Sequence, residues 1–239
     1  MTKFNSRNIL PYDKLKYFPN PFKLNNDVGL ITDFLNQDIL VEGYSNGYFP
    51  WPDSSDAKEF PWANPIYRGV IIVEEANIPK SVEKIIKKQE FYLKIDTAFS
   101  EVIENCSKRN DGEDTWITNT IKQEYLKFHE AGWAHSFETY DSQTNELVGG
   151  LYGVSVGKVF CGESMFYRKS GASKFALAKL IEILSKLNVL ILDTQMVTSV
   201  TENFGANYVD KNDYLNVFYQ LRGKPLSTEE FRLAADNLD

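Results

Sequence analysis

The sequence predicts an α/β protein of the α+β type, in which a small N-terminal domain precedes a larger domain built on a mixed sheet. Prolines and aromatic residues are dense between Phe18 and Pro65, which is typical of packed loops. Successive β-rich runs then lead to a strand, helix, strand order that ends at Asp193. The chain has 239 residues, of which 43% are hydrophobic and 14% aromatic, so it can bury a sizeable core and is not of the disordered class.

Three proline-aromatic motifs mark the N-terminal region and place its boundary. They are FPNP (Phe18–Pro21), YFPWP (Tyr48–Pro52) and FPWANP (Phe60–Pro65). Between the first two, Val28–Tyr44 predicts a strand followed by a short helix. Because proline continues neither a helix nor a central strand, we expect a domain boundary near residues 62–66, which divides the chain into domains 1–64 and 65–239.

The second region begins with a strand and three helices, and three strands follow. We expect the first strand at Gly69–Glu74, a helix opened by Pro79, and further helices at residues 95–107 and 117–131. The later strands are expected at His135–Tyr140, Glu146–Val156 and Lys158–Phe166. A turn at Gly157–Lys158 makes the last two a hairpin.

A strand, helix, strand unit completes the predicted sheet. Apolar residues recur at helical spacing within Ser173–Leu187, and Val189–Asp193 is a short buried strand. This order implies that the strands before and after the helix are parallel and joined by a right-handed crossover. Ligands of such units gather at the carboxyl ends of the strands.

Two acidic residues stand at that end of the unit. Glu163 lies late in the first strand, where Cys161, Glu163 and Met165 share one face, and Asp193 ends the second strand. Gln195 shares the face of Asp193 if the chain stays extended, so two carboxylates and an amide converge on one cleft. The alternative is that either acid caps a turn or pairs with a lysine or arginine, because buried charges are rare unless they are paired.

The turn RKSGAS (Arg168–Ser173) is similar to a motif of acyl-CoA-dependent N-acyltransferases, Arg/Gln-x-x-Gly-x-Gly/Ala, which lies between a strand and a helix. The backbone N–H groups of that motif hold a pyrophosphate at the helix N-terminus. Ser173 stands where the motif has glycine or alanine, so the match is imperfect. The alternative is an ordinary helix start, in which Ser170 or Ser173 accepts hydrogen bonds from the free N–H groups.

The helix after Pro79 carries a cluster of lysines. Four of them fall within about one third of the helix circumference: Lys80, Lys84, Lys87 and Lys88. Three apolar residues lie opposite: Val82, Ile85 and Ile86. In a chain with a formal net charge of -7, this clustering suggests contact with a phosphate backbone, and an ordinary solvated helix face is the alternative.

The remaining composition argues against several other kinds of site. The two histidines, His129 and His135, have no cysteine at a spacing that suits a metal, so we expect no metal and no cofactor. Cys106 and Cys161 form no CxxC motif, which favours reduced thiols in a cytoplasmic protein. The N-terminus lacks an apolar signal-peptide region and no run approaches the ~18 apolar residues of a membrane span, so we expect no membrane contact.

A series of motifs resembles the leucyl/phenylalanyl-tRNA–protein transferase family. They occur in family order from about residue 18 to 206: FPNP, GYFPW (Gly47–Trp51), DTAFSEVIENC (Asp96–Cys106), TWIT (Thr115–Thr118), AHSFE (Ala134–Glu138), LVGGLYGVSVGKVFCGESMF (Leu147–Phe166), ASK (Ala172–Lys174), LDTQ (Leu192–Gln195) and FGA (Phe204–Ala206). The long block from Leu147 is the most specific of these.

The resemblance implies a fold and an activity. The fold is a small N-terminal domain followed by an N-acyltransferase-like (GNAT-like) domain. The activity is transfer of Leu, Phe or, less readily, Met from aminoacyl-tRNA to a protein with N-terminal Arg or Lys, which directs the acceptor to N-end-rule degradation. An aminoacyl ester is already activated, so its aminolysis needs neither a nucleotide nor a metal.

The resemblance also implies roles for particular residues. The expected catalytic residues are Glu163, Asp193 and Gln195. The expected residues of the apolar aminoacyl pocket are Trp51, Trp116, Leu151, Phe160 and Ser164. The expected tRNA contacts are Lys80, Lys84, Lys87 and Lys88. Asp193, acting through Gln195, would hold and help deprotonate the acceptor amine, and Glu163 would orient the aminoacyl group.

Three departures from the family pattern and two alternative functions stand beside this interpretation. The family has a stretch ending in SPDPR after FPW, where this chain has ANPIYR (Ala63–Arg68), and Val200 replaces a histidine that follows D-x-Q. Lysines replace arginines in the basic helix and bind phosphate as point charges. The alternatives are an acyl-CoA-dependent N-acetyltransferase and a tRNA-binding or degron-binding module without catalysis.

Overall fold

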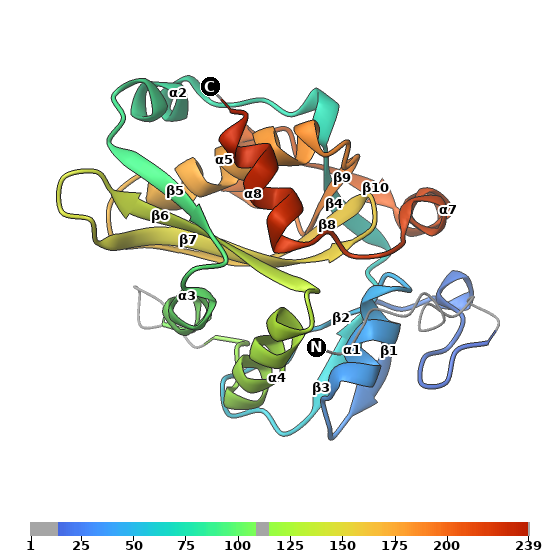
Figure 1. Cartoon of the computed structure of the whole chain (residues 1–239). Coiled ribbons are helices and arrows are strands. Elements are labelled where there is room, and N and C mark those ends of the chain that lie inside the picture. The colour runs from blue at the N-terminus through green and yellow to red at the C-terminus, as the bar shows by residue number, and fades with distance from the viewer. Residues whose placement is uncertain (1–13, 109–114, 239) are drawn as a thin grey trace.

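The computed structural model describes residues 14–108 and 115–238, and Figure 1 shows how their elements are arranged. The helices are η2 (Pro21–Lys23), α1 (Gln37–Tyr44), η3 (Val73–Glu75), α2 (Lys80–Lys87), α3 (Phe99–Cys106), α4 (Asn119–Glu130), α5 (Ala172–Lys186), α6 (Ser199–Asn203), α7 (Lys211–Leu221) and α8 (Thr228–Asp236). The strands are β1 (Val28–Thr32), β2 (Phe49–Pro50), β3 (Phe60–Ala63), β4 (Tyr67–Ile72), β5 (Phe91–Ile95), β6 (Ala134–Asp141), β7 (Leu147–Val156), β8 (Val159–Tyr167), β9 (Ile191–Gln195) and β10 (Asn207–Asp210). In those two ranges, no helix combines the length and the apolar character that crossing a membrane requires.

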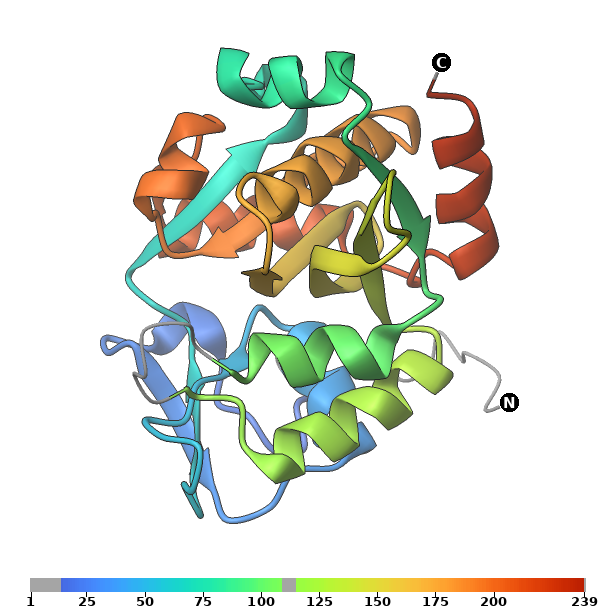
Figure 2. The ribbon, with the colours of Figure 1, turned by 90° about the vertical axis from the view of Figure 1, so that its left-hand side faces the viewer.

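Within the described residues, seven strands form one large mixed sheet in the order β10-β4-β9-β8-β7-β6-β5. Helices α5 and α8 lie on one face, and α3 and α4 lie on the other, as the perpendicular views of Figures 1 and 2 agree. Each face buries its own apolar cluster. Strands β8 and β9 are parallel, with Cys161 opposite Asp193. This pairing confirms the predicted crossover through α5, and the α+β fold class is confirmed with it.

The first part of the chain forms a separate small sheet in the order β1-β3-β2. The change from one sheet to the other falls between Ala63 and Tyr67. Phe49 and Trp62 of the small sheet are buried in the same apolar cluster as the inner faces of α3 and α4. The small sheet therefore shares its core with the large one, and the division into domains 1–64 and 65–239 stays a prediction.

Most predicted elements are confirmed within a few residues, and two details are wrong. The helix expected at residues 95–107 begins only at Phe99, because Phe91–Ile95 pairs with β6 as the edge strand β5. Helix α5 begins after Gly171, whose φ of 86° lies in the left-handed region that glycine tolerates. No side chain caps that helix start, so neither Ser170 nor Ser173 has the expected capping role.

A β-bulge interrupts the pairing of β7 with β8 at Glu163. Tyr152 lies opposite Ser164, and Gly153 lies opposite Gly162, so Glu163 is an extra residue on β8. Such a bulge bends its strand and re-aims the side chain at the insertion. The paired glycines of the two strands mark this place in the sequence.

The bulge reverses the alternation of side chains that the sequence predicts for β8. Cys161 belongs to the cluster on the α3 face, whereas Met165 packs against the cluster on the α5 face. The expectation that Cys161, Glu163 and Met165 share one face is therefore wrong. Gly153 is required opposite the bulge, because a Cβ there would collide with the carbonyl oxygen of Cys161.

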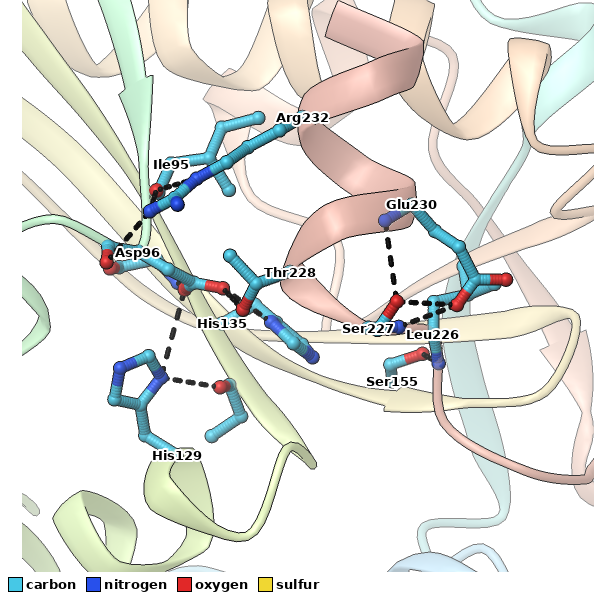
Figure 3. A network of polar contacts seen from close by, with 12 residues as sticks. Ile95, Asp96, His129, His135, Ser155, Leu226, Ser227, Thr228, Glu230 and Arg232 are labelled. Carbon is cyan, nitrogen blue, oxygen red and sulfur yellow. Dashed lines mark hydrogen bonds and ion pairs between the residues drawn. The ribbon is translucent and has the colours of Figure 1, made fainter.

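The C-terminal helix α8 is anchored to the turn that follows β5. Thr228 donates a hydrogen bond of 2.5 Å to Asp96 Oδ2, and Arg232 donates one of 2.6 Å to the carbonyl of Ile95 (Figure 3). His135 Nδ1 lies 2.7 Å from the same Asp96 oxygen. Asp96 and His135 belong to motifs that resemble the family, and their contacts here hold the end of the chain against the sheet.

Replacing Phe231 by alanine is expected to lower the free energy of unfolding by about 3–5 kcal/mol. The ring is fully buried and packs edge-on against Phe137 and Phe160. Leu233→Ala is the matched control, because Leu233 lies on the same helix with 57% of its surface exposed, and its cost should stay within about 0.5 kcal/mol. Denaturant unfolding measures both, and equal losses would contradict the anchoring role of Phe231.

Candidate active site

A cavity opens where the parallel strands β8 and β9 separate. Their pairing ends at Cys161 and Asp193, and β8 continues to Tyr167. The cavity has a volume of about 270 Å³. Its apolar lining consists of Pro50, Trp51, Trp116, Leu151, Met165, Leu177, Leu180, Leu192 and Met196. Its polar lining includes Tyr152, Glu163, Ser164, Thr194, Gln195, Thr198 and Thr201. The sheet split therefore brings a carboxyl and an amide to the wall of a mainly apolar pocket.

Glu163 and Gln195 meet across the gap between the two strands. Gln195 Nε2 donates a hydrogen bond of 3.0 Å to Glu163 Oε1. Burial raises the pKa of the Glu163 carboxyl to about 8; the negative charge of Asp193 acts in the same direction, and the Tyr44 hydroxyl and the Arg68 charge oppose it. The carboxyl is therefore largely protonated at neutral pH, which lowers the cost of placing it beside apolar side chains.

Asp193 lies behind the cavity wall and is fully buried. Its oxygens accept hydrogen bonds from Arg68 Nε at 2.8 Å, Arg68 Nη2 at 2.6 Å and the Tyr214 hydroxyl at 2.7 Å. Asp193 therefore pairs with an arginine, which was the alternative interpretation of this residue from the sequence. It does not itself line the cavity.

The backbone at Gln195 leaves the extended conformation. Its φ is 63°, and its N–H donates a hydrogen bond of 2.9 Å to Asp193 Oδ1. Left-handed backbone is unfavourable for residues other than glycine and persists where surrounding contacts hold it. The condition for Gln195 to share the face of Asp193 is therefore not met, and its side chain turns to Glu163.

The structure brings together most of the residues expected in the aminoacyl pocket. Trp51, Trp116, Leu151 and Ser164 line the cavity. Phe160 does not, because it has no exposed surface and packs in the core, where its ring centroid lies 5.7 Å from that of Phe137. The roles of these residues in binding stay predictions.

Helix α2 has the amphipathic form that its sequence predicts. Its lysines Lys80, Lys84 and Lys87 are exposed, and so is Lys88 at its C-cap. On the opposite side Val82 is fully buried, and Ile85 packs directly on Gly171 in the turn before α5. The turn that is similar to a pyrophosphate-binding motif is thus in contact with an apolar side chain. Contact of the lysines with tRNA stays a prediction.

Sequence reasoning singled out none of three residues that adjoin the acid–amide pair: Tyr44, Tyr125 and Arg68. Tyr44 of α1 and Tyr125 of α4 are buried, and their hydroxyl groups hydrogen-bond each other although the residues are 81 positions apart. No local pattern indicates such an encounter. Arg68 carried a usable signal, because it ends the ANPIYR stretch as an arginine ends the family's SPDPR.

The composition of the cavity limits what it can bind. In residues 14–108 and 115–238, no three side chains of His, Cys, Asp or Glu gather closely enough to hold a metal ion. An apolar pocket with a few polar groups on one wall suits an uncharged aliphatic or aromatic group attached to a polar reacting centre. The Glu163–Gln195 pair marks the wall at which that centre would lie.

Comparison with known proteins identifies the class and then the family. The family profile described as Leucyl/phenylalanyl-tRNA protein transferase matches residues 70–219. The protein named leucyl/phenylalanyl-tRNA–protein transferase from Shewanella baltica (strain OS185) is 38% identical over 213 residues, covering 87% of this chain and 88% of its own length. The protein of that name from Tolumonas auensis is 39% identical over 221 residues, covering 91% and 93%. The solved structure of L-PGS from Bacillus licheniformis overlaps with a TM-score of 0.39 at 10% identity, covering 84% of this chain and 64% of that chain.

The two named relatives cover most of this chain, and their names describe an aminoacyltransferase. The chain belongs to the leucyl/phenylalanyl-tRNA–protein transferase family. The family and the enzyme class predicted from the motifs are thereby confirmed.

Replacing Glu163 by glutamine should remove part of the pH dependence of stability. Because the pKa of Glu163 is raised from near 4.5 to about 8, the folded state binds more protons than the unfolded state between these values. The free energy of unfolding of the unmodified protein should therefore fall as pH rises from about 5 to 8 and then level off. In Glu163→Gln this component is absent, since the amide does not titrate.

Denaturant unfolding at pH 5.5 and 8.5 measures the difference. The matched control is Glu229→Gln, an exposed position that should keep the pH dependence of the unmodified protein. A Glu163→Gln variant with the same pH dependence as that control would show that Glu163 titrates normally.

Proposed function

We propose that this chain transfers Leu or Phe, and less readily Met, from aminoacyl-tRNA to the α-amino group of proteins that begin with Arg or Lys. The product is then a substrate for N-end-rule degradation, and the reaction takes place in the cytoplasm. The observation that carries the proposal is the apolar cavity with the Glu163–Gln195 pair on its wall, in a chain of this family.

The cavity suits the aminoacyl group. Its walls combine leucine and methionine side chains with the indole rings of Trp51 and Trp116, so an aliphatic or aromatic side chain would be sheltered from water there. Burial of such a side chain contributes about 1.5–3 kcal/mol. The ester carbonyl attached to it would then lie near the polar wall.

The reaction balances without a cofactor. The acceptor nitrogen forms a bond to the ester carbonyl carbon, the bond from that carbon to the tRNA ribose oxygen breaks, and a proton from the amine ends on the released hydroxyl. An α-amino group has a pKa of about 7.7–8.0, so roughly a third is neutral near pH 7.5. Orientation at attack distance therefore supplies much of the acceleration.

The acid–amide pair suits proton handling at this step. The pKa of Glu163, about 8, is close to that of the acceptor amine, and matched values favour proton exchange between two groups. Glu163 thus orients the aminoacyl group and accepts or returns a proton. Gln195 holds the amine, and Asp193 acts through Gln195 because it does not reach the cavity.

The exposed lysines of α2 suit the phosphate backbone of tRNA, whereas the overall charge of -7 suits a cationic acceptor. Attraction of both an anionic and a cationic substrate argues against a module that only binds one partner.

The acyl-CoA alternative is disfavoured by Ile85, which packs on the turn where a pyrophosphate would lie. Acetyl-CoA should therefore show no binding heat in calorimetry.

The direct test is label transfer from Leu-tRNA or Phe-tRNA to a peptide that begins with Arg or Lys. Gln195→Ala should lower turnover about 100-fold while tRNA affinity stays within about twofold, because the side chain acts on the amine rather than on tRNA. Gln123→Ala, an exposed glutamine on α4, is the control and should keep full turnover. A loss of tRNA affinity in Gln195→Ala without loss of turnover would contradict the assigned role.

Replacing Lys84 and Lys87 together by alanine should weaken tRNA binding and lower the slope of log affinity against log salt by about 1 for each lysine. Lys186→Ala is the control, since this exposed lysine lies at the far end of α5 from α2. Filter binding over a series of salt concentrations measures the slopes. An unchanged slope in the double variant would remove α2 from the tRNA contact.

A further inference from the structure

Arg68 occupies an unusual position for a charged residue. It lies on β4, next to β9 in the large sheet, and has 1% of its surface exposed. Its guanidinium holds both oxygens of Asp193 through Nε and Nη2. Arginine is suited to this bidentate contact because its donors are fixed in one plane.

The third guanidinium nitrogen of Arg68 reaches the turn that precedes the cavity-lining residues Pro50 and Trp51. Nη1 donates a hydrogen bond of 3.1 Å to the carbonyl of Gly47, in the turn that leads through β2 to Trp51. The guanidinium also lies 4.5 Å from the ring centroid of Phe49 on β2 and 4.8 Å from that of Tyr214 on α7. One side chain thus contacts the small sheet, β9 and α7 together.

The contact with Asp193 extends to Gln195. Asp193 Oδ1 accepts both Arg68 Nε and the N–H of Gln195, and the latter bond holds Gln195 at its φ of 63°. In that conformation the amide of Gln195 reaches Glu163. The orientation of the acid–amide pair therefore depends on an aspartate that Arg68 keeps in place.

We propose that Arg68 is a positioning residue that sets two walls of the active site at once: the Gln195 wall through Asp193, and the Trp51 wall through Gly47. The proposal rests on the proposed function for its effect on turnover, but its structural part does not. Loss of Arg68 geometry should disturb residues 193–197 and residues 47–51 together.

Arg222 provides a matched control within the chain. Its Nη1 donates to the carbonyl of Ser45 at 2.6 Å and to Asn46 Oδ1 at 2.7 Å, and its guanidinium stacks on Tyr219. It therefore tethers the same turn from α7 but has no contact with Asp193. A variant at Arg222 reports loss of an arginine tether alone.

The first experiment compares hydrogen exchange in Arg68→Lys and Arg222→Lys. Lysine keeps the positive charge but cannot hold both Asp193 oxygens and the Gly47 carbonyl. Arg68→Lys should speed exchange at least tenfold in peptides that cover residues 47–51 and 193–197, whereas Arg222→Lys should affect the first of these alone. Unchanged exchange in residues 193–197 of Arg68→Lys would overturn the proposal, whatever reaction the protein catalyses.

The second experiment measures kcat and KM for transfer from aminoacyl-tRNA. Arg68→Lys should lower kcat at least tenfold and raise KM several-fold, because both walls are displaced, and Arg222→Lys should keep kcat within twofold. Thermal unfolding of both variants shows whether their stabilities match. Equal losses of kcat at matched stability would overturn the proposal in favour of a general tether.

The pH profile separates the geometry of Arg68 from its charge. The Arg68 charge lowers the pKa of Glu163, so Arg68→Gln should move the midpoint of the pH–rate profile upward, and further than Arg68→Lys, which keeps the charge. Arg68→Gln leaves Asp193 buried with its charge uncompensated, which is costly; if that variant does not fold, the lysine variant still decides the proposal. If the unmodified protein makes no product, the proposed function is rejected. The hydrogen-exchange experiment then still tests whether Arg68 positions the two walls.

Discussion

The buried pair of Arg68 and Asp193 is the interaction on which the site depends. Neither side chain reaches water, and a single unpaired charge in that place would cost several kcal/mol. The pair is tolerable because every nitrogen of the Arg68 guanidinium makes a hydrogen bond and Asp193 accepts bonds from Arg68, Tyr214 and the Gln195 backbone. These bonds join β4, β9 and α7, and the bond from Arg68 Nη1 to the carbonyl of Gly47 adds the turn before β2. The contacts that compensate the buried charges are thus the same contacts that hold the cavity wall in shape.

The cavity itself follows from the geometry of the sheet. Parallel strands β8 and β9 stay paired only as far as Cys161 and Asp193, and the bulge at Glu163 bends β8 just beyond that point. The opening is lined on one side by Leu177 and Leu180 of α5 and on another by Trp51, which follows β2, and Trp116, which precedes α4. Glycine at 153 lets the two strands accommodate the bulge, because a Cβ there would collide with the carbonyl oxygen of Cys161 and with the ring of Phe160.

Placing a carboxyl group in this opening alters its chemistry. The apolar surroundings that would receive an aminoacyl side chain also disfavour the charged form of Glu163 and raise its pKa to about 8. A group that titrates close to an α-amino group exchanges protons with it at little cost. The apolar pocket and the basicity of its acid therefore have one physical cause, which is exclusion of water from the gap between the strands.

Local patterns located some residues of the site and missed others for physical reasons. Trp51 and Trp116 line the cavity as their motifs suggested. Phe160 belongs to the same motif block and the same apolar cluster as Leu151, but it lies in the part of β8 that still pairs with β9 and is buried short of the opening. The amphipathic α2 was predictable from the 3.6-residue period alone, since its lysines and isoleucines interact mainly with their immediate surroundings.

The sequence by itself determined the family and the order of the elements, and it placed Glu163 and Gln195 among the candidate site residues, because these are encoded in contiguous motifs and in the periodicity of apolar residues. Only the tertiary structure decided that Asp193 lies behind the wall, that Gln195 leaves the extended conformation, and that Arg68 joins the two sheets. Those features depend on the ion pair between Arg68 and Asp193, which are 125 positions apart, and there the need to compensate a buried charge overrides the local preference of each segment.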